Sequence, residues 1–299
     1  IDDLDAIKAY AEQSRVGVVV GGGLLGLECA NALKSLGLET HVVEFAPRLM
    51  PVQLDETGGE ILKTQIEDLG VQVHTSKATT DIVSENGKLA SMQFADETSL
   101  QTDMIVFSAG IRPRDELARD CDLQIGERGG VVIDEDCRTS DPNIYAIGEC
   151  ALYQGRIFGL VAPGYQMAEV ASDQLLAVTA PQQFMGADMS TKLKLLGVDV
   201  ASFGDNFAKT SGAKELVVTD AVAGTYKKLV VTADGSTLLG GILVGDATAY
   251  GNLLQLMQNQ IALPANPLGL LVPVGDAVPA LSMESLPDAA QNCSCNNVS

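Results

Sequence analysis

The chain has 299 residues, a length that fits about two domains, and 46% of its residues are hydrophobic, as in a globular protein. Its formal net charge of −20 argues against nucleic acid or an anionic membrane as a partner, since both are polyanions. There is no apolar run of the roughly 18 residues that span a membrane, no signal-peptide pattern, and only six scattered cysteines. We therefore expect a soluble cytoplasmic protein without a disulfide framework.

A glycine-rich turn is the first motif that carries chemistry. Residues 16–20 form a β-branched strand pattern, and Gly21, Gly23 and Gly26 follow it, before a helix predicted over residues 24–36. Gly21 suits a tight turn, Gly23 lets a pyrophosphate approach the backbone, and Gly26 lets helix and strand pack closely. The phosphates would bind the free N–H groups at the helix start. A βαβ unit whose glycines are only structural is the alternative.

An acidic residue ends the next predicted strand. Glu44 lies 23 residues after Gly21, where a carboxylate can accept hydrogen bonds from the adenosine ribose hydroxyls. A carboxylate at this position would repel the 2′-phosphate of NADPH, although Arg48 lies four residues on and could soften that preference. The sequence therefore predicts that NADH binds more tightly than NADPH.

The first 113 residues fit one α/β domain. The pattern of residues 1–14 predicts a short acidic helix. Asn86-Gly87 is a strong hairpin signal within a run of short segments. These segments predict a small antiparallel meander inserted into a parallel sheet. The other predicted elements are a helix over 55–69, strands over 71–74 and 104–107, and short β segments over 78–84, 88–94 and 98–101.

This order of elements resembles the NAD domain of the pyridine nucleotide-disulfide oxidoreductase superfamily, whose members bind both NAD and FAD. Residues 139–149 resemble its second flavin motif, a threonine followed by an apolar strand that ends in Gly-Asp. The resemblance implies that the backbone at Gly148 binds the FAD pyrophosphate and that the carboxylate binds a ribityl hydroxyl. Glu149 stands where aspartate is commoner, which leaves the geometry of that contact open.

A helix predicted over residues 166–176 follows Pro163 and Gly164, which suit a helix start. In the superfamily the start of the corresponding helix points at the flavin pyrimidine ring. The resemblance implies that the helix dipole stabilises negative charge on the reduced flavin.

The last third of the chain changes to short β segments. From residue 190 onward five such segments, a turn at Asp234-Gly235 and a helix over 250–259 predict a separate α+β domain that covers the flavin side or meets a partner. A proline-rich linker leads to Cys293 and Cys295, followed by Asn-Asn-Val-Ser. This end resembles the opening of a bacterioferritin-associated ferredoxin-like [2Fe-2S] module. Such a module after this flavoprotein layout is typical of NAD(P)H nitrite reductase large subunits.

The resemblance implies a chain of electron carriers. NADH would reduce FAD, and electrons would continue to [2Fe-2S], [4Fe-4S] and sirohaem centres of the parent protein, which reduces nitrite to ammonium. The remaining domains of the parent and a small reductase subunit are the implied partners. The implied domains are an NAD-binding domain over 1–113, the C-terminal part of an FAD-binding domain over 114–186, an α+β domain over 187–263, and a linker with the start of the [2Fe-2S] module over 264–299.

The sequence departs from the family at two points. No strand-glycine-helix unit for FAD precedes Ile1, and a [2Fe-2S] cluster needs four cysteine ligands, of which Cys293 and Cys295 supply two. We therefore expect an internal fragment with a formed NAD site, half a flavin site and no cluster. Such a fragment would be colourless and inactive alone but would still bind NADH.

Some site residues are implied by the resemblance alone. Leu24 occupies the position from which a side chain covers the flavin face in the superfamily. Glu28 aligns with a glutamate that lies near the nicotinamide carboxamide. Ala109-Gly110 would line the other side of the NAD cleft. The residues expected to bind cofactors are Gly21, Gly23, Leu24, Leu25, Gly26, Glu28, Glu44, Arg48, Ala109, Gly110, Gly148, Glu149, Pro163 and Gly164, with Cys293 and Cys295 as metal ligands.

Two other functions stay open. One is a rubredoxin- or ferredoxin-type NADH reductase, against which the Cys-x-Cys end argues. The other is a non-catalytic nucleotide-binding module, which a fragment with an incomplete flavin pocket could become. Isolated cysteines and the two histidines, His41 and His74, are interpreted as packing residues, since hydride transfer between two cofactors needs no general base.

Overall fold

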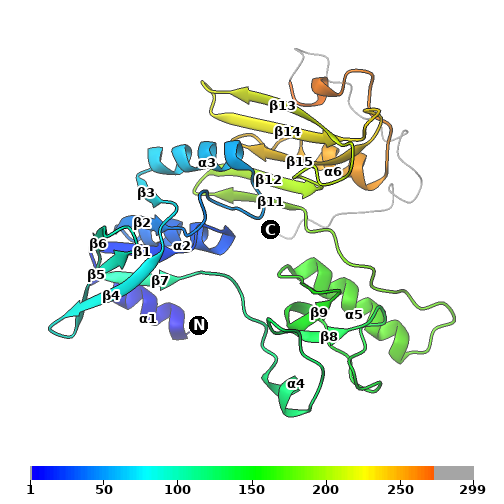
Figure 1. The fold of residues 1–299 in the computed structure, drawn as a ribbon, viewed down its shortest axis with the longest axis horizontal. Coiled ribbons are helices and arrows are strands. Elements are labelled where there is room, and N and C mark those ends of the chain that lie inside the picture. The colour runs from blue at the N-terminus through cyan, green and yellow to red at the C-terminus, as the bar shows by residue number, and fades with distance from the viewer. Residues whose placement is uncertain (1, 273–299) are drawn as a thin grey trace. The chain divides into compact units, whose positions relative to one another are not determined.

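In the computed structural model, which describes residues 2–272, the glycine-rich segment follows the first strand of a four-stranded parallel sheet (Figure 1). Strands β1 (Val16–Val20), β2 (Glu39–Val43), β3 (Val71–His74) and β7 (Met104–Phe107) lie in the order β3-β2-β1-β7. Helix α2 (Leu24–Ser35) connects β1 to β2, and α3 (Glu56–Asp68) connects β2 to β3. Because the order reverses beside β1, the carboxyl ends of β1 and β7 form a topological switch point, where such sheets bind ligands.

The predicted meander covers one face of this sheet. Strands β4 (Thr79–Glu85), β5 (Lys88–Phe94) and β6 (Ser99–Gln101) form the antiparallel order β4-β5-β6. Val18 and Val43 of the parallel sheet share a buried cluster with Met92 and Phe94 of β5. Val19 and Val42 face the opposite way, into the cluster that holds α2 and α3. Burial on both faces explains why β1 is an unbroken apolar run.

Residues Gly110–Met189 form a second compact unit with its own core. Its strands are β8 (Val131–Ile133), β9 (Ala151–Tyr153) and β10 (Arg156–Ile157), and its helices are α4 (Glu116–Asp120) and α5 (Val161–Leu175). The core contains Phe158, Met167 and Phe184. Phe184 meets the rings of Tyr153 and Phe158 edge-on, at centroid distances of 5.2 and 5.3 Å.

Two predictions for this unit are wrong in detail. Helix α5 begins at Val161, five residues before the predicted start, because Pro163 falls in the first turn, where its missing N–H would have no helical partner in any case. The predicted apolar strand before Gly148 is an irregular segment with a single bridge, from Tyr145 to Arg138, and it leads into a short 3₁₀ turn, η1 (Gly148–Cys150). A strand needs pairing along consecutive residues, and this segment has it at one position only.

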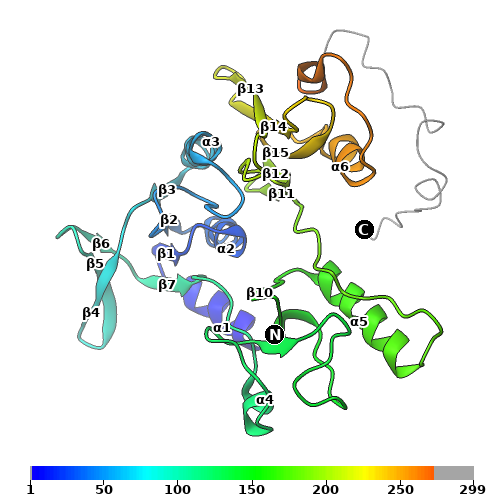
Figure 2. The same cartoon turned by 45° about the vertical axis from the view of Figure 1, so that its right-hand side comes forward.

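A five-stranded antiparallel sheet follows, in the order β11-β12-β15-β14-β13. Its elements are β11 (Thr191–Leu195), β12 (Val198–Gly204), β13 (Lys214–Asp220), β14 (Thr225–Val231), β15 (Leu238–Val244), α6 (Tyr250–Gln258) and η2 (Pro267–Leu270). Helix α6 packs on one face of this sheet. The other face packs against α2 and α3, which lie between the two sheets (Figure 2).

The five-stranded sheet therefore shares a core with the parallel sheet. Val200, Tyr226 and Ile242 belong to the same buried cluster as Leu27 and Leu62 of the helices. This contact differs from the prediction of a separate α+β domain that covers the flavin side or meets a partner, because residues 2–109 and 190–272 form one compact unit. The described chain continues to residue 272, and Leu271 is buried against the α6 side of the sheet. The rest of the predicted linker lies outside the described residues.

No helix among residues 2–272 is long and apolar enough to span a membrane.

Both histidines of the chain lie side by side on β2 and β3. His41 Nδ1 and His74 Nε2 are 3.0 Å apart, and the two rings stack with centroids 5.3 Å apart. Burial lowers the pKa of both imidazoles, and the charge of His41 lowers the pKa of His74 further; Glu39, 3.4 Å from His41 Nε2, partly offsets the effect of burial on His41. The pair is therefore stable in the neutral form.

This pair predicts a loss of stability in mild acid. The pKa values of both histidines are lower in the folded than in the unfolded chain. The neutral pair therefore contributes its full stabilisation above about pH 6.5, and this stabilisation is lost as the pH falls through the pKa values of the folded chain. The free energy of unfolding should fall by at most about 1.4 kcal/mol per pH unit for each proton taken up. Urea unfolding at several pH values between 7.5 and 5 measures this slope, and His74→Gln should make it shallower. An equal slope in the variant would contradict this assignment.

Candidate functional site

Two of the three motif glycines lie in contact with backbone that leaves no room for a side chain. Gly21 has φ +117°, and a Cβ on it would lie 2.3 Å from the Ser108 carbonyl oxygen. A Cβ on Gly26 would lie 1.8 Å from the Gly21 carbonyl oxygen. Residue 26 must therefore be glycine for α2 to approach β1 this closely. The contact between Gly21 and Ser108 also joins the ends of β1 and β7 at the switch point.

Gly23 is different, because a Cβ there would meet nothing within 4 Å. It precedes the first turn of α2 in an extended conformation, and no side chain caps the helix. Open space at a helix N-terminus with free N–H groups fits a pyrophosphate, which is attracted both by these donors and by the helix dipole. The structure thus fits the predicted role of the glycine turn.

Glu44 is fixed by the glycine turn itself. Its Oε2 accepts a hydrogen bond from the Gly22 N–H at 2.6 Å, and its Oε1 accepts one from the Ala46 N–H at 2.7 Å. Its own N–H donates to the His74 carbonyl at 2.8 Å, which continues the pairing of β2 with β3. A carboxylate offers about four acceptor positions, so lone pairs are left for ribose hydroxyls. The half-buried Glu44 therefore fits the predicted ribose site.

Arg48 is engaged within its own loop. Its Nε donates to the Leu54 carbonyl at 2.9 Å and its Nη2 to the Pro51 carbonyl at 3.5 Å. The Arg48 stem packs over α3, because a Cβ on Gly59 would come within 2.8 Å of the Arg48 Cβ. These two bonds direct the guanidinium toward its own loop and use two of its five N–H donors. This arrangement supports the prediction that NADH binds more tightly than NADPH.

The other predicted residues of the first unit occupy three kinds of environment. Leu24, the first residue of α2, packs against the core, whereas Leu25 is 61% exposed. Glu28 and Ala109 are exposed, and the Ala109 nitrogen lies 3.3 Å from the position that a Gly21 Cβ would take. Gly110 is the first residue of the second unit. The glycine turn, Glu44 and Ala109 thus come together at the switch point.

The predicted flavin residues also lie together, within the second unit. A Cβ on Gly164 would lie 3.5 Å from the Gly148 Cα, and the Gly148 N–H donates to the Met167 sulfur at 3.2 Å. Glu149 is exposed, and Pro163 is buried in the first turn of α5. No side chain caps α5, so its first N–H groups are free of side-chain partners. Free backbone donors beside an exposed carboxylate fit a ligand that carries both acceptor and hydroxyl groups.

The described cysteines form no redox pair or metal site. Cys29, Cys121, Cys137 and Cys150 are all free thiols, and burial raises the pKa of Cys137 to about 11, with Asp134 and Asp136 adding to the shift. Within residues 2–272 there is no group of three or more potential metal ligands. The predicted ligands Cys293 and Cys295 lie outside the described residues.

One part of the site was not predicted from the sequence. Residues 45–55, called loop 45–55 here, connect Glu44 to α3 and contact Tyr226 and Lys228 of β14 through Asp55. The available signal was the pair Lys227-Lys228 inside the apolar strand Thr225–Val231. Two adjacent lysines point to opposite faces of a strand. If other elements pack on either face of the sheet, at least one of the two lysines is buried, and a buried lysine needs an acidic partner.

Comparison with known proteins agrees with this architecture. The family model of the pyridine nucleotide-disulphide oxidoreductases matches residues 1–174. The chain belongs to this family. The model of the rubredoxin NAD+ reductase C-terminal domain matches residues 190–261, which contain the five-stranded sheet. The predicted superfamily and the predicted α/β fold class are therefore confirmed.

The chain is also similar to longer members of this family. It is 59% identical over 301 residues to the nitrite reductase [NAD(P)H] large subunit of Klebsiella oxytoca and 56% identical over 301 residues to the nitrite reductase (NADH) large subunit of Escherichia coli strain K12. All of this chain takes part in both matches, but it spans only 31% and 35% of those proteins. Among solved structures, a NAD-dependent persulfide reductase from A. fulgidus matches with a TM-score of 0.70 and 28% identity, over 83% of this chain and 49% of that one. The predicted resemblance to nitrite reductase large subunits is confirmed.

Proposed function

We propose that this chain is the NADH-binding reductase portion of a nitrite reductase large subunit. In the parent protein it would pass electrons from NADH to FAD and on to iron-sulfur and sirohaem centres, for the reduction of nitrite to ammonium. The proposal is supported by identities of 56–59% along the entire chain to proteins of that name. The observation that carries the NADH part is the glycine turn whose N–H at Gly22 holds the Glu44 carboxylate at 2.6 Å.

Each residue of the first unit has a distinct part in this proposal. Gly21 and Gly26 bring β1, β7 and α2 into close contact, which places the free N–H groups of the α2 start at the switch point. Gly23 leaves room there for the pyrophosphate, and Glu44 accepts hydrogen bonds from the adenosine ribose. Leu24, Leu25, Glu28 and Ala109 would then orient the nicotinamide end.

The second unit would hold FAD. Gly148, Gly164 and the uncapped start of α5 offer backbone to its polar groups, and Glu149 would accept a hydrogen bond from a ribityl hydroxyl. When bound, FAD accepts hydride from NADH and releases electrons one at a time. The residues of this chain bind and orient the two nucleotides, and Cys293 and Cys295 remain the proposed first ligands of a [2Fe-2S] cluster. The other parent domains and a small reductase subunit are the proposed partners.

A second candidate is a rubredoxin- or ferredoxin-type NADH reductase. It is favoured by the match of residues 190–261 to the C-terminal domain of rubredoxin NAD+ reductases. The two candidates share the NADH and FAD sites and differ in the electron acceptor. Electron transfer from the NADH-reduced parent protein to nitrite or to an added rubredoxin would therefore distinguish them.

The NADH site predicts a clear order of affinities. NADH should bind more tightly than NADPH, because the Glu44 carboxylate opposes a 2′-phosphate and Arg48 is bonded within its loop. The chain contains no tryptophan, so the fluorescence of the bound dihydronicotinamide can be followed without interference from one. The titration is repeated after FAD is added, with the visible spectrum recorded to test for flavin bleaching by NADH. Tighter binding of NADPH, or no binding of either nucleotide, would refute the assignment.

A further inference from the structure

Loop 45–55 contacts the glycine turn at Gly22. The Met50 N–H donates to the Gly22 carbonyl at 2.9 Å, and the Leu49 Cδ2 lies 2.6 Å from where a Gly22 Cβ would be. Leu49, Met50 and Leu54 are all completely buried. Since the Gly22 N–H in turn donates to Glu44, hydrogen bonds connect this loop through Gly22 to the Glu44 carboxylate.

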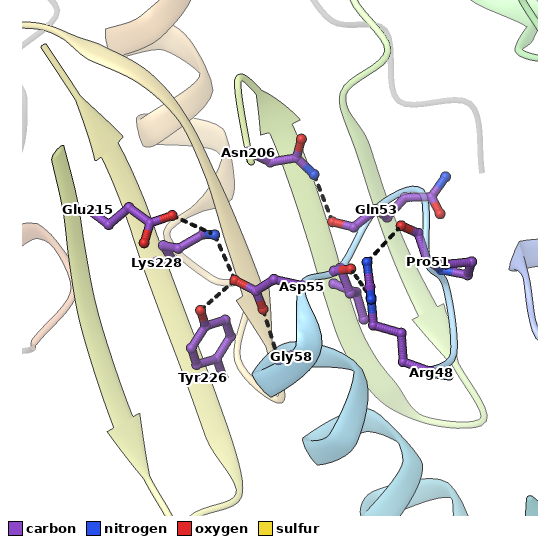
Figure 3. A network of polar contacts seen from close by, with 10 residues as sticks. Arg48, Pro51, Gln53, Asp55, Gly58, Asn206, Glu215, Tyr226 and Lys228 are labelled. Atoms are coloured by element: carbon purple, nitrogen blue, oxygen red, sulfur yellow. Dashed lines mark hydrogen bonds and ion pairs between the residues drawn. The ribbon is translucent and has the colours of Figure 1, made fainter. Parts of the chain in front are cut away.

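The far end of the loop is anchored to the five-stranded sheet (Figure 3). Asp55 Oδ2 accepts hydrogen bonds from Lys228 Nζ at 2.6 Å and from the Tyr226 hydroxyl at 2.7 Å. Asp55 Oδ1 caps α3 by accepting from the Gly58 N–H at 3.0 Å. The Asn206 amide donates to the Gln53 carbonyl at 2.8 Å. Three side chains from the five-stranded sheet and its β12 end thus fix the segment that supports the glycine turn.

The lysine of this network is shielded from water. The Lys228 side chain is 4% exposed, and its Nζ also lies 3.1 Å from Glu215. Burial would raise the pKa of Asp55, but the hydrogen bonds from Lys228, Gly58 and Tyr226 outweigh it and leave this pKa lowered. Burial and the bond to Asp55 raise the pKa of Tyr226, so its hydroxyl stays protonated and donates. Removing the lysine would leave a partly buried carboxylate without its ion pair, which is costly.

The neighbouring lysine has the same chemistry in a different place. Lys227 is 10% exposed at its side chain and pairs with Asp246 at 2.5 Å. It points to the α6 face of the sheet, because adjacent strand residues face opposite ways. Lys227 is therefore buried and ion-paired as Lys228 is, but it has no contact with loop 45–55.

We propose that Tyr226 and Lys228 are positioning residues for the NADH site, which act through Asp55 on loop 45–55 and set the preference for NADH over NADPH. The preference follows because the anchored loop keeps the Pro51 and Leu54 carbonyls in place as acceptors for Arg48. A loosened loop shifts Glu44 and releases the guanidinium toward a 2′-phosphate. This inference rests on the proposed NADH-binding function.

The test compares Lys228→Met with Lys227→Met in the full 299-residue chain. The dissociation constants of NADH and NADPH are measured by titration calorimetry for each variant. Lys228→Met should raise the NADH constant about five- to tenfold, the scale on which positions along a coupling path act. The NADPH constant should rise less or fall, so that the ratio of the two constants narrows. Lys227→Met should change neither constant more than about twofold, and Lys228→Arg should restore the ratio.

Tyr226→Phe keeps the test decisive if Lys228→Met does not fold. It removes one hydroxyl and should raise the NADH constant about two- to threefold, again with a narrower ratio. Equal effects in the two methionine variants, or an unchanged ratio in both Tyr226→Phe and Lys228→Met, would overturn the inference while the proposed function stands. A wild-type chain that binds no NADH would overturn the proposed function, and the inference with it.

Discussion

Gly26→Ala should destabilise the fold and abolish NADH binding at the same time. The added Cβ would lie 1.8 Å from the Gly21 carbonyl oxygen, so α2 has to move away from β1. The added Cβ meets backbone rather than the end of a flexible side chain. The free energy of unfolding should therefore fall by about 3 kcal/mol, the upper part of the range for overpacked cores. Urea unfolding followed by far-ultraviolet circular dichroism measures the stability, and a nucleotide titration measures the binding.

Gly23→Ala is the matched control for this experiment. Its Cβ would meet nothing within 4 Å, and φ at this residue is −85°, which alanine adopts without strain. The fold should lose at most about 1 kcal/mol, since alanine is a poorer helix cap than glycine. NADH binding should nevertheless weaken at least about tenfold, because the methyl group occupies the space proposed for the pyrophosphate. If the two variants were equally stable, the close approach of α2 to β1 would be wrong.

Local patterns predicted most elements of this chain, and the reasons are physical. Apolar runs bounded by glycine turns located β1 and β7, and the Asn86-Gly87 turn located the β4–β5 hairpin, since both residues have positive φ. Each of these signals lies within a few residues of the structure that it specifies. The glycine turn and Glu44 were found together for the same reason, because the βαβ unit that joins them is one continuous segment.

Contacts between distant segments were not predictable in this way. Asp55 was recognised only as the start of α3, yet the same carboxylate bonds Tyr226, which lies 171 residues further along the chain. Nothing in the pattern of either segment specifies the other. The five-stranded sheet was predicted strand by strand, but its docking on α2 and α3 depends on how two amphipathic surfaces fit. Likewise, Pro163 correctly indicated that a helix begins nearby, but it did not indicate the first residue of that helix, because proline is tolerated throughout the first turn.

Glu44→Ala should weaken NADH binding about 10- to 100-fold, the loss expected when hydrogen bonds to a charged acceptor disappear. Two effects add up in this variant. The ribose hydroxyls lose their acceptor, and the N–H groups of Gly22 and Ala46 lose the carboxylate that fixes the turn. Binding of NADPH should suffer less, since removal of the negative charge also removes the repulsion of the 2′-phosphate. Titrations with both nucleotides measure the two constants.

Glu39→Ala provides the control for charge. It removes one negative charge from the opposite end of the same strand, where Glu39 bonds Gln72 and lies 3.4 Å from His41. At physiological salt such a distant exposed charge is largely screened, so the NADH constant should stay within about twofold of the wild-type value. Equal losses in the two variants would mean that net charge, rather than the carboxylate held by Gly22, governs binding. A loss confined to Glu44→Ala would place the ribose at the end of β2, where the glycine turn and loop 45–55 converge on one carboxylate.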